Sequence, residues 1–299
     1  MQTIAYLGPE KTNTHLAALK AFGRGSRYVH APTIEDVFHL VERRHADCGV
    51  VPIENSLGGA VTHTLDRFID FLDTPVKIQG EIEQPIRHSL LLPRGSTLAK
   101  VSVVYSHPQA FEQCHKWLHA QLKHVVRSET TSTAEAVRYL LRAKVGAASP
   151  PWTVRERAAI APKALADEHR LKAIAIPEER ENTTRFLVLG LGEPPRGRRN
   201  KTAILVGLKD KPGALHDALV PFKRERINLT KIESRPSRRK AWEYLFFIDV
   251  EGHESEPRVR RALRALERST SLLRILGSYP VARGVRPQAQ QSRGFPHGV

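Results

Sequence analysis

Apolar and polar positions along the first 190 residues alternate between short hydrophobic runs and amphipathic stretches, which is typical of the strands and helices of an α/β fold. The predicted strands or extended segments cover 3–8, 48–55, 76–92, 100–106, 144–149 and 186–189. The predicted helices cover 14–23, 34–46, 61–72, 108–122 and 132–143, and a further helix begins near Pro150. Directly before the last strand stand Thr183, Thr184 and Arg185, whose polar groups need partners if they are buried.

The pattern breaks at "GLGEPPRGRRNK", residues 190–201, which is rich in glycine, proline and arginine and has no periodicity. After this linker the elements follow the order β-α-β-β-α-β of a ferredoxin-like unit. Its predicted strands cover 202–208, 227–235, 242–252 and 271–279, and its helices cover 213–226 and 257–269. We therefore expect one domain over 1–190, a linker over 191–200, a second domain over 201–280 and a disordered tail over 281–299.

Composition agrees with a globular protein of two domains. The chain has 299 residues, of which 40% are hydrophobic and 26% are charged, and it holds no apolar run long enough to span a membrane. The N-terminus enters a strand pattern without a basic leader, so we expect a cytoplasmic protein. Cys48 and Cys114 are too few for a disulfide framework and lack the spacing of a zinc site, so buried thiols are expected.

A formal net charge of +16 favours anionic partners. The basic residues are scattered, however, and 6% aromatic residues provide no stacking platform for nucleic acid. The arginine-rich helix at 257–269 has its apolar positions at helical spacing, so its arginines are expected to face solvent. A small anionic substrate is therefore favoured, with no nucleic-acid or membrane partner.

Several predicted helices begin at polar turns that follow strands. Ser132 with Glu135 forms a capping box, and Ser106 or His107 precedes Pro108 in the first turn of another helix. Helix starts carry free amides and partial positive charge, and in an α/β sheet they gather where ligands bind. Together with Arg185 they suit a small anion with more than one charge. The alternative is that each of these residues is a plain helix cap.

Six motifs resemble, in order and spacing, those of the prephenate dehydratase family. They are "VVPIENSLGGAVTHTLD", "SHPQAFEQC", "STAEA" and "NTTRFLVLG" of the catalytic domain, and "PGALHDAL" and "NLTKIESRPS" of an ACT regulatory domain. The resemblance covers about residues 3 to 280 and is to the form without a chorismate mutase segment. It implies a two-lobed catalytic domain resembling periplasmic binding proteins, followed by a ferredoxin-like ACT domain. It also implies conversion of prephenate to phenylpyruvate, with no cofactor and no metal.

The resemblance assigns the substrate site residue by residue. Thr184 is expected to be catalytic as a hydrogen-bond donor to the leaving oxygen. Glu54 is the candidate acid, and the alternative for it is a salt-bridged carboxylate at the hinge between the lobes. The expected substrate-binding residues are Thr12, Asn55, Ser56, Ser106, Gln109, Ser132, Thr133, Arg185, which would hold a carboxylate, and Phe186, which would wall the cleft.

In the second domain the resemblance implies inhibition by L-phenylalanine bound between paired ACT domains, and hence a homodimer or homotetramer. The residues expected to bind it are Gly213, Ala214, Leu215, Asn228, Glu233, Ser234 and Arg235.

One departure from the family pattern stands at the N-terminal turn, where "KTNT", residues 11–14, replaces the usual "GTFS". Lys11 in place of glycine restricts the backbone, and Asn13 in place of phenylalanine removes an apolar anchor. Two alternative functions therefore stay open, an arogenate dehydratase and a non-catalytic amino-acid-sensing protein.

Overall fold

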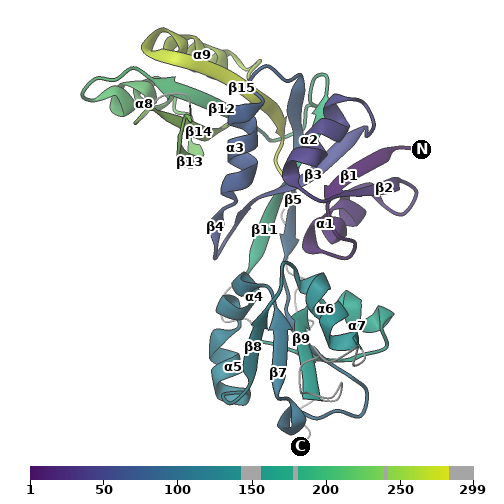
Figure 1. Cartoon of the computed structure of the whole chain (residues 1–299). Coiled ribbons are helices and arrows are strands. Elements are labelled where there is room, and N and C mark those ends of the chain that lie inside the picture. The colour runs from purple at the N-terminus through teal and green to yellow at the C-terminus, as the bar shows by residue number, and fades with distance from the viewer. Residues whose placement is uncertain (143–155, 178–180, 239–241, 283–299) are drawn as a thin grey trace, which may run out of the picture.

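The computed structural model describes residues 1–142, 156–177, 181–238 and 242–282, and its strands form three sheets. Figure 1 shows two lobes joined by the long strands β5 and β11, with a C-terminal unit beside the first lobe. We call these parts lobe 1, lobe 2 and the C-terminal unit. Among the described residues no helix is both long and apolar enough to cross a membrane.

Lobe 1 is built on a sheet in the order β2-β1-β3-β11-β5, with β4 paired to β3. Its elements are β1 (Thr3–Leu7), α1 (Asn13–Phe22), β2 (Arg27–Ala31), α2 (Ile34–Glu42), β3 (Cys48–Asn55), β4 (Gly59–Ala60), α3 (Thr62–Asp70), β5 (Val76–Pro85) and β11 (Thr183–Leu191). Strand β1 is parallel to β2 and β3, whereas β11 is antiparallel to β3 and β5. Helices cover the sheet, so β1 and β3 are buried and their sequences are almost continuously apolar.

Lobe 2 is a sheet in the order β10-β6-β9-β7-β8. Its elements are β6 (Ser89–Leu92), the short helix η1 (Leu98–Lys100), β7 (Val103–Ser106), α4 (Pro108–Gln113), α5 (His115–Gln121), β8 (Val126–Glu129), α6 (Thr133–Leu141), β9 (Arg157–Ala161), α7 (Lys163–Glu168) and β10 (Lys172–Ala175). The chain enters lobe 2 after β5 and returns through β11, and these two strands pair from Thr183 opposite Pro85 onward. Both connections between the lobes therefore lie side by side.

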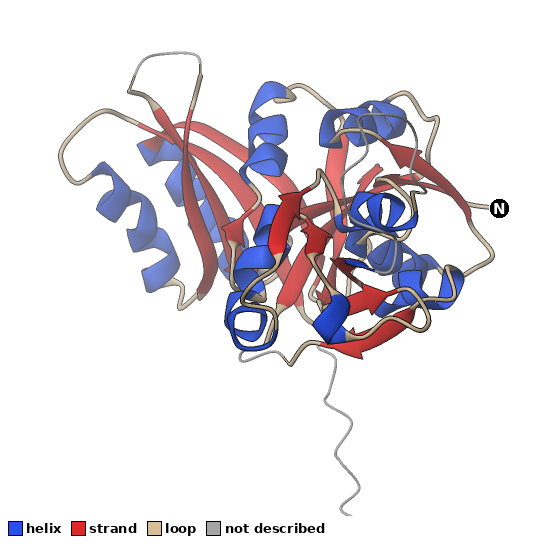
Figure 2. Cartoon of the chain, turned by 60° about the horizontal axis from the view of Figure 1, so that its bottom comes forward, coloured by secondary structure: helices blue, strands red, loops and turns tan. Residues whose placement is uncertain are grey.

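The C-terminal unit has a four-stranded antiparallel sheet in the order β13-β14-β12-β15. Its elements are β12 (Asn200–Leu208), α8 (Ala214–Arg224), β13 (Leu229–Pro236), β14 (Tyr244–Glu251), α9 (Pro257–Ser269) and β15 (Thr270–Pro280). In Figure 2 its helices lie on the outer side of the sheet, and its strands face the rest of the molecule. Helix α9 buries Val259, Ala262, Leu263 and Leu266 and leaves its arginines outside, as its spacing predicts.

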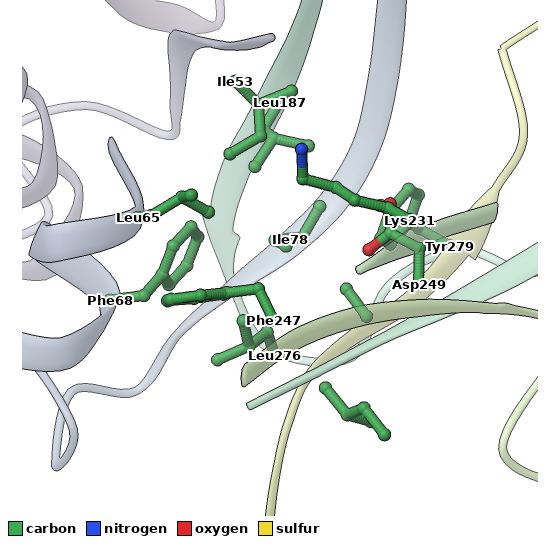
Figure 3. A pocket seen from close by; sticks show the side chains of 12 residues that line it. Ile53, Leu65, Phe68, Ile78, Leu187, Lys231, Phe247, Asp249, Leu276 and Tyr279 are labelled. Carbon is green, nitrogen blue, oxygen red and sulfur yellow. The ribbon is translucent and has the colours of Figure 1, made fainter. Parts of the chain in front are cut away.

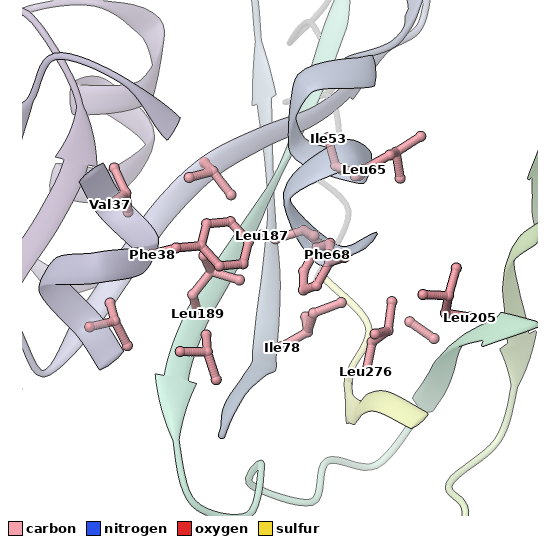
Figure 4. Packing of buried hydrophobic residues seen from close by; sticks show 14 of the residues in the cluster. Val37, Phe38, Ile53, Leu65, Phe68, Ile78, Leu187, Leu189, Leu205 and Leu276 are labelled. Carbon is pink, nitrogen blue, oxygen red and sulfur yellow. The ribbon is translucent and has the colours of Figure 1, made fainter. Parts of the chain in front are cut away.

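The inner face of the C-terminal sheet packs directly on lobe 1. Leu205, Phe247 and Leu276 share one apolar cluster with Phe68 of α3 and Leu187 of β11. Figure 4 shows Phe68, Leu187, Leu205 and Leu276 of this cluster between α3 and the strands of both sheets. Lobe 1 and the C-terminal unit therefore have a common core, which makes β11 a point of contact between them.

The architecture of a two-lobed α/β domain followed by a ferredoxin-like unit is confirmed, with local corrections. The predicted helix over 108–122 is two helices, α4 and α5, which meet at Cys114. Strands β2, β8 and β10 were not predicted because they lie at sheet edges, where exposed positions carry no apolar alternation. The central strand β9 and the helix α7 were also missed, and β9 falls where the helix from near Pro150 was predicted to continue. The predicted strand at 144–149, the helix start near Pro150 and most of the tail lie outside the described residues.

Candidate substrate site

A cavity of about 250 Å³ lies where lobes 1 and 2 meet. Its walls come from the carboxyl ends of β1 and β3, the start of β11, and the starts of α1, α4 and α6. The lining residues are Leu7, Gly8, Thr12, Asn13, Thr14, Asn55, Ile86, His88, His107, Gln109, Ala110, Gln113, Thr131, Ser132, Thr133 and Thr184. This is the position at which open α/β sheets bind ligands.

Side-chain caps hold the helix starts at the cavity wall. The Thr12 hydroxyl accepts a hydrogen bond from the backbone of His15 in α1, and the Ser132 hydroxyl accepts one from Glu135 in α6. The Nδ1 of His107 accepts from the backbone of Gln109 at the start of α4. These caps confirm the predicted helix starts, and residues of these starts line the cavity, where the partial positive charge of a helix start favours an anion.

Thr184 lies at the cavity wall, where Asn55 positions it. The Nδ2 of Asn55 donates to the Thr184 Oγ1 at 2.9 Å. The Oδ1 of Asn55 accepts from the backbone amides of Leu57 and Gly58 at 3.0 and 2.8 Å, so the orientation of this amide is determined. In the described part of the chain the Thr184 hydroxyl proton has no acceptor, and it is therefore available to a ligand.

A chain of amides continues from Asn55 across the cleft. The Nδ2 of Asn55 also donates to the Oδ1 of Asn182 at 2.7 Å, and the Nδ2 of Asn182 donates to the Oε1 of Gln113 at 3.1 Å. The same Gln113 oxygen lies 2.7 Å from the Nε2 of His88. Asn55 belongs to lobe 1 and Gln113 to lobe 2, so the chain joins the two lobes beside the cavity.

The electrostatic field in the cavity comes from the dipoles of the helix starts and from the imidazoles of His88 and His107. Its described lining contains no lysine, arginine, aspartate or glutamate. Burial lowers the pKa of His88 and of His107, and for His107 the nearby Glu129 partly opposes this effect. An anion in this cavity would therefore be met by helix-start amides, hydroxyls and uncharged side chains.

The structure corrects the expectation for Arg185, because alternation along β11 directs it away from Thr184. Its guanidinium lies 2.5 Å from Glu54, 3.3 Å from Glu81 and 3.5 Å from Asp249 of the C-terminal unit. The side chain is 11% exposed and does not line the cavity. Arg185 is therefore part of an ion cluster between lobe 1 and the C-terminal unit.

Glu54 belongs to the same cluster, which agrees with its alternative reading as a salt-bridged carboxylate. Its Oε2 lies 2.5 Å from the Nζ of Lys231. Burial alone would raise the pKa of Glu54, but the hydrogen bond from Lys231 and the charge of Arg185 hold that pKa below its usual value. The structure thus corrects the expectation of a catalytic acid, because Glu54 is ionised and lies outside the cavity lining.

Three other predicted site residues lie outside the cavity lining and fix the ends of the strands that border the cavity. Phe186 is 1% exposed and packs in a core with Tyr6 and Ala17, so it does not wall the cleft. The Ser106 hydroxyl is buried and donates to the backbone oxygen of Ile160. The Ser56 hydroxyl donates to the backbone oxygen of Glu181. These residues fix the ends of β3, β7 and β11, and none of them is among the lining residues.

Thr12, Asn55, Gln109, Ser132, Thr133 and Thr184 are brought together at the cavity as predicted. The prediction missed His88, His107 as a lining residue, Gln113 and Asn182. Gln113 follows Gln109 by four positions, which places both on one helix face and could have identified it. His88 and Asn182 carry no such local signal.

Lys11 shows how the altered N-terminal turn is accommodated. Its φ is 63°, in the left-handed region that glycine adopts most easily. Its backbone amide donates to the Nδ1 of His15, and its ammonium group pairs with Glu168 of α7 in lobe 2. The turn therefore keeps the backbone conformation expected for glycine, and Lys11 bridges the lobes outside the cavity lining.

In the C-terminal unit the predicted effector residues lie in two places. Gly213 has a φ of 76° and caps α8, which begins with Ala214 and Leu215. Arg235 instead turns toward lobe 1, where its Nε and Nη2 donate hydrogen bonds to the two carboxylate oxygens of Asp66 at 3.0 and 3.1 Å. Asn228 precedes β13, and Glu233 and Ser234 lie within it. Within one chain Arg235 thus joins the C-terminal unit to α3.

A second, smaller cavity lies between lobe 1 and the C-terminal unit. It measures about 20 Å³, which is room for about one water molecule. Figure 3 shows Lys231 reaching from β13 toward Ile53 and Leu187, with Asp249 and Tyr279 beside its stem. The described residues contain no cluster of three or more histidine, cysteine, aspartate or glutamate side chains that could hold a metal ion.

Family models match both the lobes and the C-terminal unit. The prephenate dehydratase family model matches residues 4–194, and the ACT domain model matches residues 202–268. A bifunctional chorismate mutase/prephenate dehydratase of Aquifex aeolicus is 46% identical over 282 residues, which are 93% of this chain and 74% of that protein. A prephenate dehydratase of Methanocaldococcus jannaschii is 38% identical, over 83% of this chain and 86% of that protein.

A solved structure extends the similarity to three dimensions. The crystal structure of prephenate dehydratase from Arthrobacter aurescens in complex with L-Phe has a TM-score of 0.82 and 32% sequence identity to this chain. The alignment covers 94% of this chain and 90% of that one.

Proposed function

This chain belongs to the prephenate dehydratase family, and we propose that it converts prephenate to phenylpyruvate in the cavity between lobes 1 and 2. The observation that carries the proposal is the placement of Thr184. Its oxygen accepts a hydrogen bond from Asn55, and its proton is uncommitted within a cavity bordered by helix starts from both lobes. A hydroxyl held in this way can donate to an oxygen that gains negative charge.

The chemistry of the substrate explains why such a site suffices. Prephenate is a dianion with a hydroxyl on its ring. The reaction breaks the bond to the ring carboxylate and the bond to the hydroxyl oxygen, and it yields carbon dioxide, the phenylpyruvate anion and a hydroxide that takes up one proton to form water. Because the ring becomes aromatic, the enzyme must mainly orient the two leaving groups and stabilise charge on the oxygen.

We assign the roles around the substrate accordingly. Thr184 donates a hydrogen bond to the departing hydroxyl oxygen, and Asn55 holds Thr184 in place. Thr12, Ser132 and Thr133, with the amides at the starts of α1 and α6, receive the carboxylates. Uncharged donors fit this task, because fixed dipoles need no reorganisation when charge moves within the substrate.

Regulation by L-phenylalanine is the second part of the proposal. The ACT domain match and the Arthrobacter aurescens structure in complex with L-Phe support it. Gly213, at the left-handed start of α8, provides amides for a carboxylate, and Ala214, Leu215, Asn228, Glu233 and Ser234 would complete the site. Arg235 would act by joining the effector site to α3 through Asp66.

Assembly through the C-terminal unit supports the same proposal. Strand β13 is at the edge of its sheet, and Ile232 on it is 46% exposed. An edge strand with an exposed apolar residue is a template for pairing with another strand. We propose a homodimer or homotetramer in the cytoplasm, with the effector bound between paired C-terminal units.

The test is an assay of the purified chain with prephenate, in which phenylpyruvate formation is followed with and without L-phenylalanine. Turnover that L-phenylalanine suppresses is the expected result. Turnover of arogenate in preference to prephenate would favour the arogenate dehydratase, and binding of L-phenylalanine without turnover of either compound would favour a non-catalytic sensor.

A further inference from the structure

The amide chain beside the cavity determines where the proton of His88 lies. The backbone amides of Leu57 and Gly58 both donate to the Oδ1 of Asn55, so the Nδ2 of Asn55 must be the donor to Asn182. The Asn182 oxygen is therefore the acceptor, and its nitrogen donates to Gln113. Each amide in the chain is oriented by the one before it, starting from backbone groups that cannot turn over.

The last member of this chain is an imidazole. The Oε1 of Gln113 accepts from Asn182, and the second group within reach of that oxygen is the Nε2 of His88 at 2.7 Å. Two acceptors cannot face each other at this distance, so the Nε2 of His88 carries a proton. The Nε2 of Gln113 points toward the Oδ1 of Asn55 at 3.4 Å, which agrees with this orientation.

The other nitrogen of His88 is then a bare acceptor. His88 is 5% exposed, its ring lines the substrate cavity, and its Nδ1 is buried without a hydrogen-bond partner among the described residues. A buried acceptor without a partner costs about 1–3 kcal/mol. The hydrogen bonds among Asn55, Asn182 and Gln113 nevertheless orient these three amides so that the Nδ1 of His88 stays unprotonated. A hydrogen-bond donor on a ligand would offset the free energy that the unpaired nitrogen costs.

We propose that His88 is a specificity-determining residue whose Nδ1 accepts the hydrogen bond of the substrate's ring hydroxyl. This inference rests on the proposed function. At neutral pH both carboxylates of the substrate are ionised, so the ring hydroxyl is its only strong hydrogen-bond donor. When the hydroxyl proton points to His88, a lone pair of the same oxygen is free to accept from Thr184. The product has lost this hydroxyl, so His88 favours the substrate over the product.

Asn182 and Gln113 act through His88 as positioning residues. Asn182 is 3% exposed and does not line the cavity, so it has no direct contact with a ligand there. An aspartate at this position could still accept from Asn55, but its second oxygen would turn the Gln113 amide over. The imidazole would then face an N–H group, and its proton would be found on Nδ1.

The first experiment reads the protonation of the ring directly. The full chain is labelled with ¹⁵N-histidine, and the ring signals of His88 are identified by their loss in His88→Gln. We expect an Nε2–H tautomer in the wild type and a protonated Nδ1 in Asn182→Asp. A proton on Nδ1 in the wild type, or no change in Asn182→Asp, would overturn the inference, and neither result depends on catalysis.

The second experiment separates recognition of the hydroxyl from general damage to the site. In His88→Gln the amide can still donate to Gln113, but the Nδ1 acceptor is gone. We expect the KM for prephenate to rise about tenfold, while inhibition by phenylpyruvate changes less than about twofold because that compound has no ring hydroxyl. Equal weakening of both compounds would assign His88 a structural role and reject the inference.

His39→Gln is the matched control. His39 also has a buried Nδ1 without a hydrogen-bond partner, but it lies on α2, outside the cavity lining. We expect no change in either constant for this variant. If the wild-type chain does not turn over prephenate, the proposed function fails, whereas the tautomer measurement still tests the arrangement around His88.

Discussion

Strand β11 presents Thr184 to the cavity and Arg185 to the C-terminal unit, and the two sides differ in charge. On the cavity side the described lining contains only neutral side chains, oriented by backbone amides and by one another. On the other side Arg185 lies among the carboxylates of Glu54, Glu81 and Asp249, of which Glu81 and Asp249 are buried. Lys201 and Lys231 complete this ion cluster.

The difference shows how one strand serves both parts of the molecule. A dianionic substrate needs fixed donors, and permanent ion pairs next to it would compete for those donors. Strong ion pairs are instead used where two parts of the chain must stay in register, and there they are shielded from solvent. Because these groups alternate along β11, a movement of the C-terminal unit would act on the residue next to Thr184.

Removal of Arg185 should have the largest effect. In Arg185→Met the buried carboxylates lose their central cation, and we expect the free energy of unfolding to fall by about 3–5 kcal/mol. Urea denaturation followed by tryptophan fluorescence measures it. Arg261→Met is the control, because Arg261 forms an exposed ion pair with Glu225 and its loss should not be measurable. Equal losses in the two variants would show that the ion cluster has no special role.

Removal of the Thr184 hydroxyl tests the neutral side. Thr184→Val keeps the shape of the side chain, and we expect kcat to fall about 100-fold, or about 2.7 kcal/mol. Thr184→Ser keeps the hydroxyl and should retain most of the activity. Both variants should unfold at the urea concentration of the wild type. A kcat near that of the wild type in Thr184→Val would remove Thr184 from the mechanism.

Regulation should respond to Gly213. The left-handed backbone at Gly213 opposes any side chain, although a Cβ there would meet no atom within 4 Å. In Gly213→Ala we expect inhibition by L-phenylalanine to weaken about tenfold, within the usual 1–3 kcal/mol of allosteric coupling, while uninhibited turnover stays unchanged. Gly95→Ala, in lobe 2, has a similar φ of 82° and equal space, and it should not affect inhibition. Unaltered inhibition in Gly213→Ala would place the effector elsewhere.

The smallest effect concerns pH. The pKa of Glu54 is lowered in the folded chain, so the stability that its ionised form contributes is present above the usual glutamate pKa of 4.5 and is lost as the pH falls through the folded pKa. Burial raises the pKa of Asp249, so the contribution of Asp249 to stability changes with pH in the opposite direction. The contribution of Glu54 must therefore be measured separately, by comparing the wild type with a variant at this one position. We expect the difference in free energy of unfolding between wild type and Glu54→Gln to shrink below about pH 4.5. A difference independent of pH would contradict the pairing of Glu54.

Local sequence patterns predicted most of the buried elements, together with the helix caps, but they missed the buried central strand β9. The capping residue Ser132 and the buried face of α9 were correct because both depend on residues a few positions apart. The position of Thr184 at the start of β11 was predicted correctly, because Thr184 stands just before an apolar run. Edge strands such as β2 were missed, since solvent on one side removes the apolar alternation.

Only the tertiary structure decided which partners the polar residues meet. Arg185 looked like a carboxylate receptor, but the register of β11 and the docking of the C-terminal unit direct it to Glu54, Glu81 and Asp249. Asn182, Gln113 and His88 meet although 69 and 25 positions separate the bonded pairs. The sequence by itself determined the elements and the family motifs, because these are local. Which polar side chains meet depends on sheet order and domain packing. These bring residues together that are far apart in the sequence, and no short-range pattern in the sequence reports them.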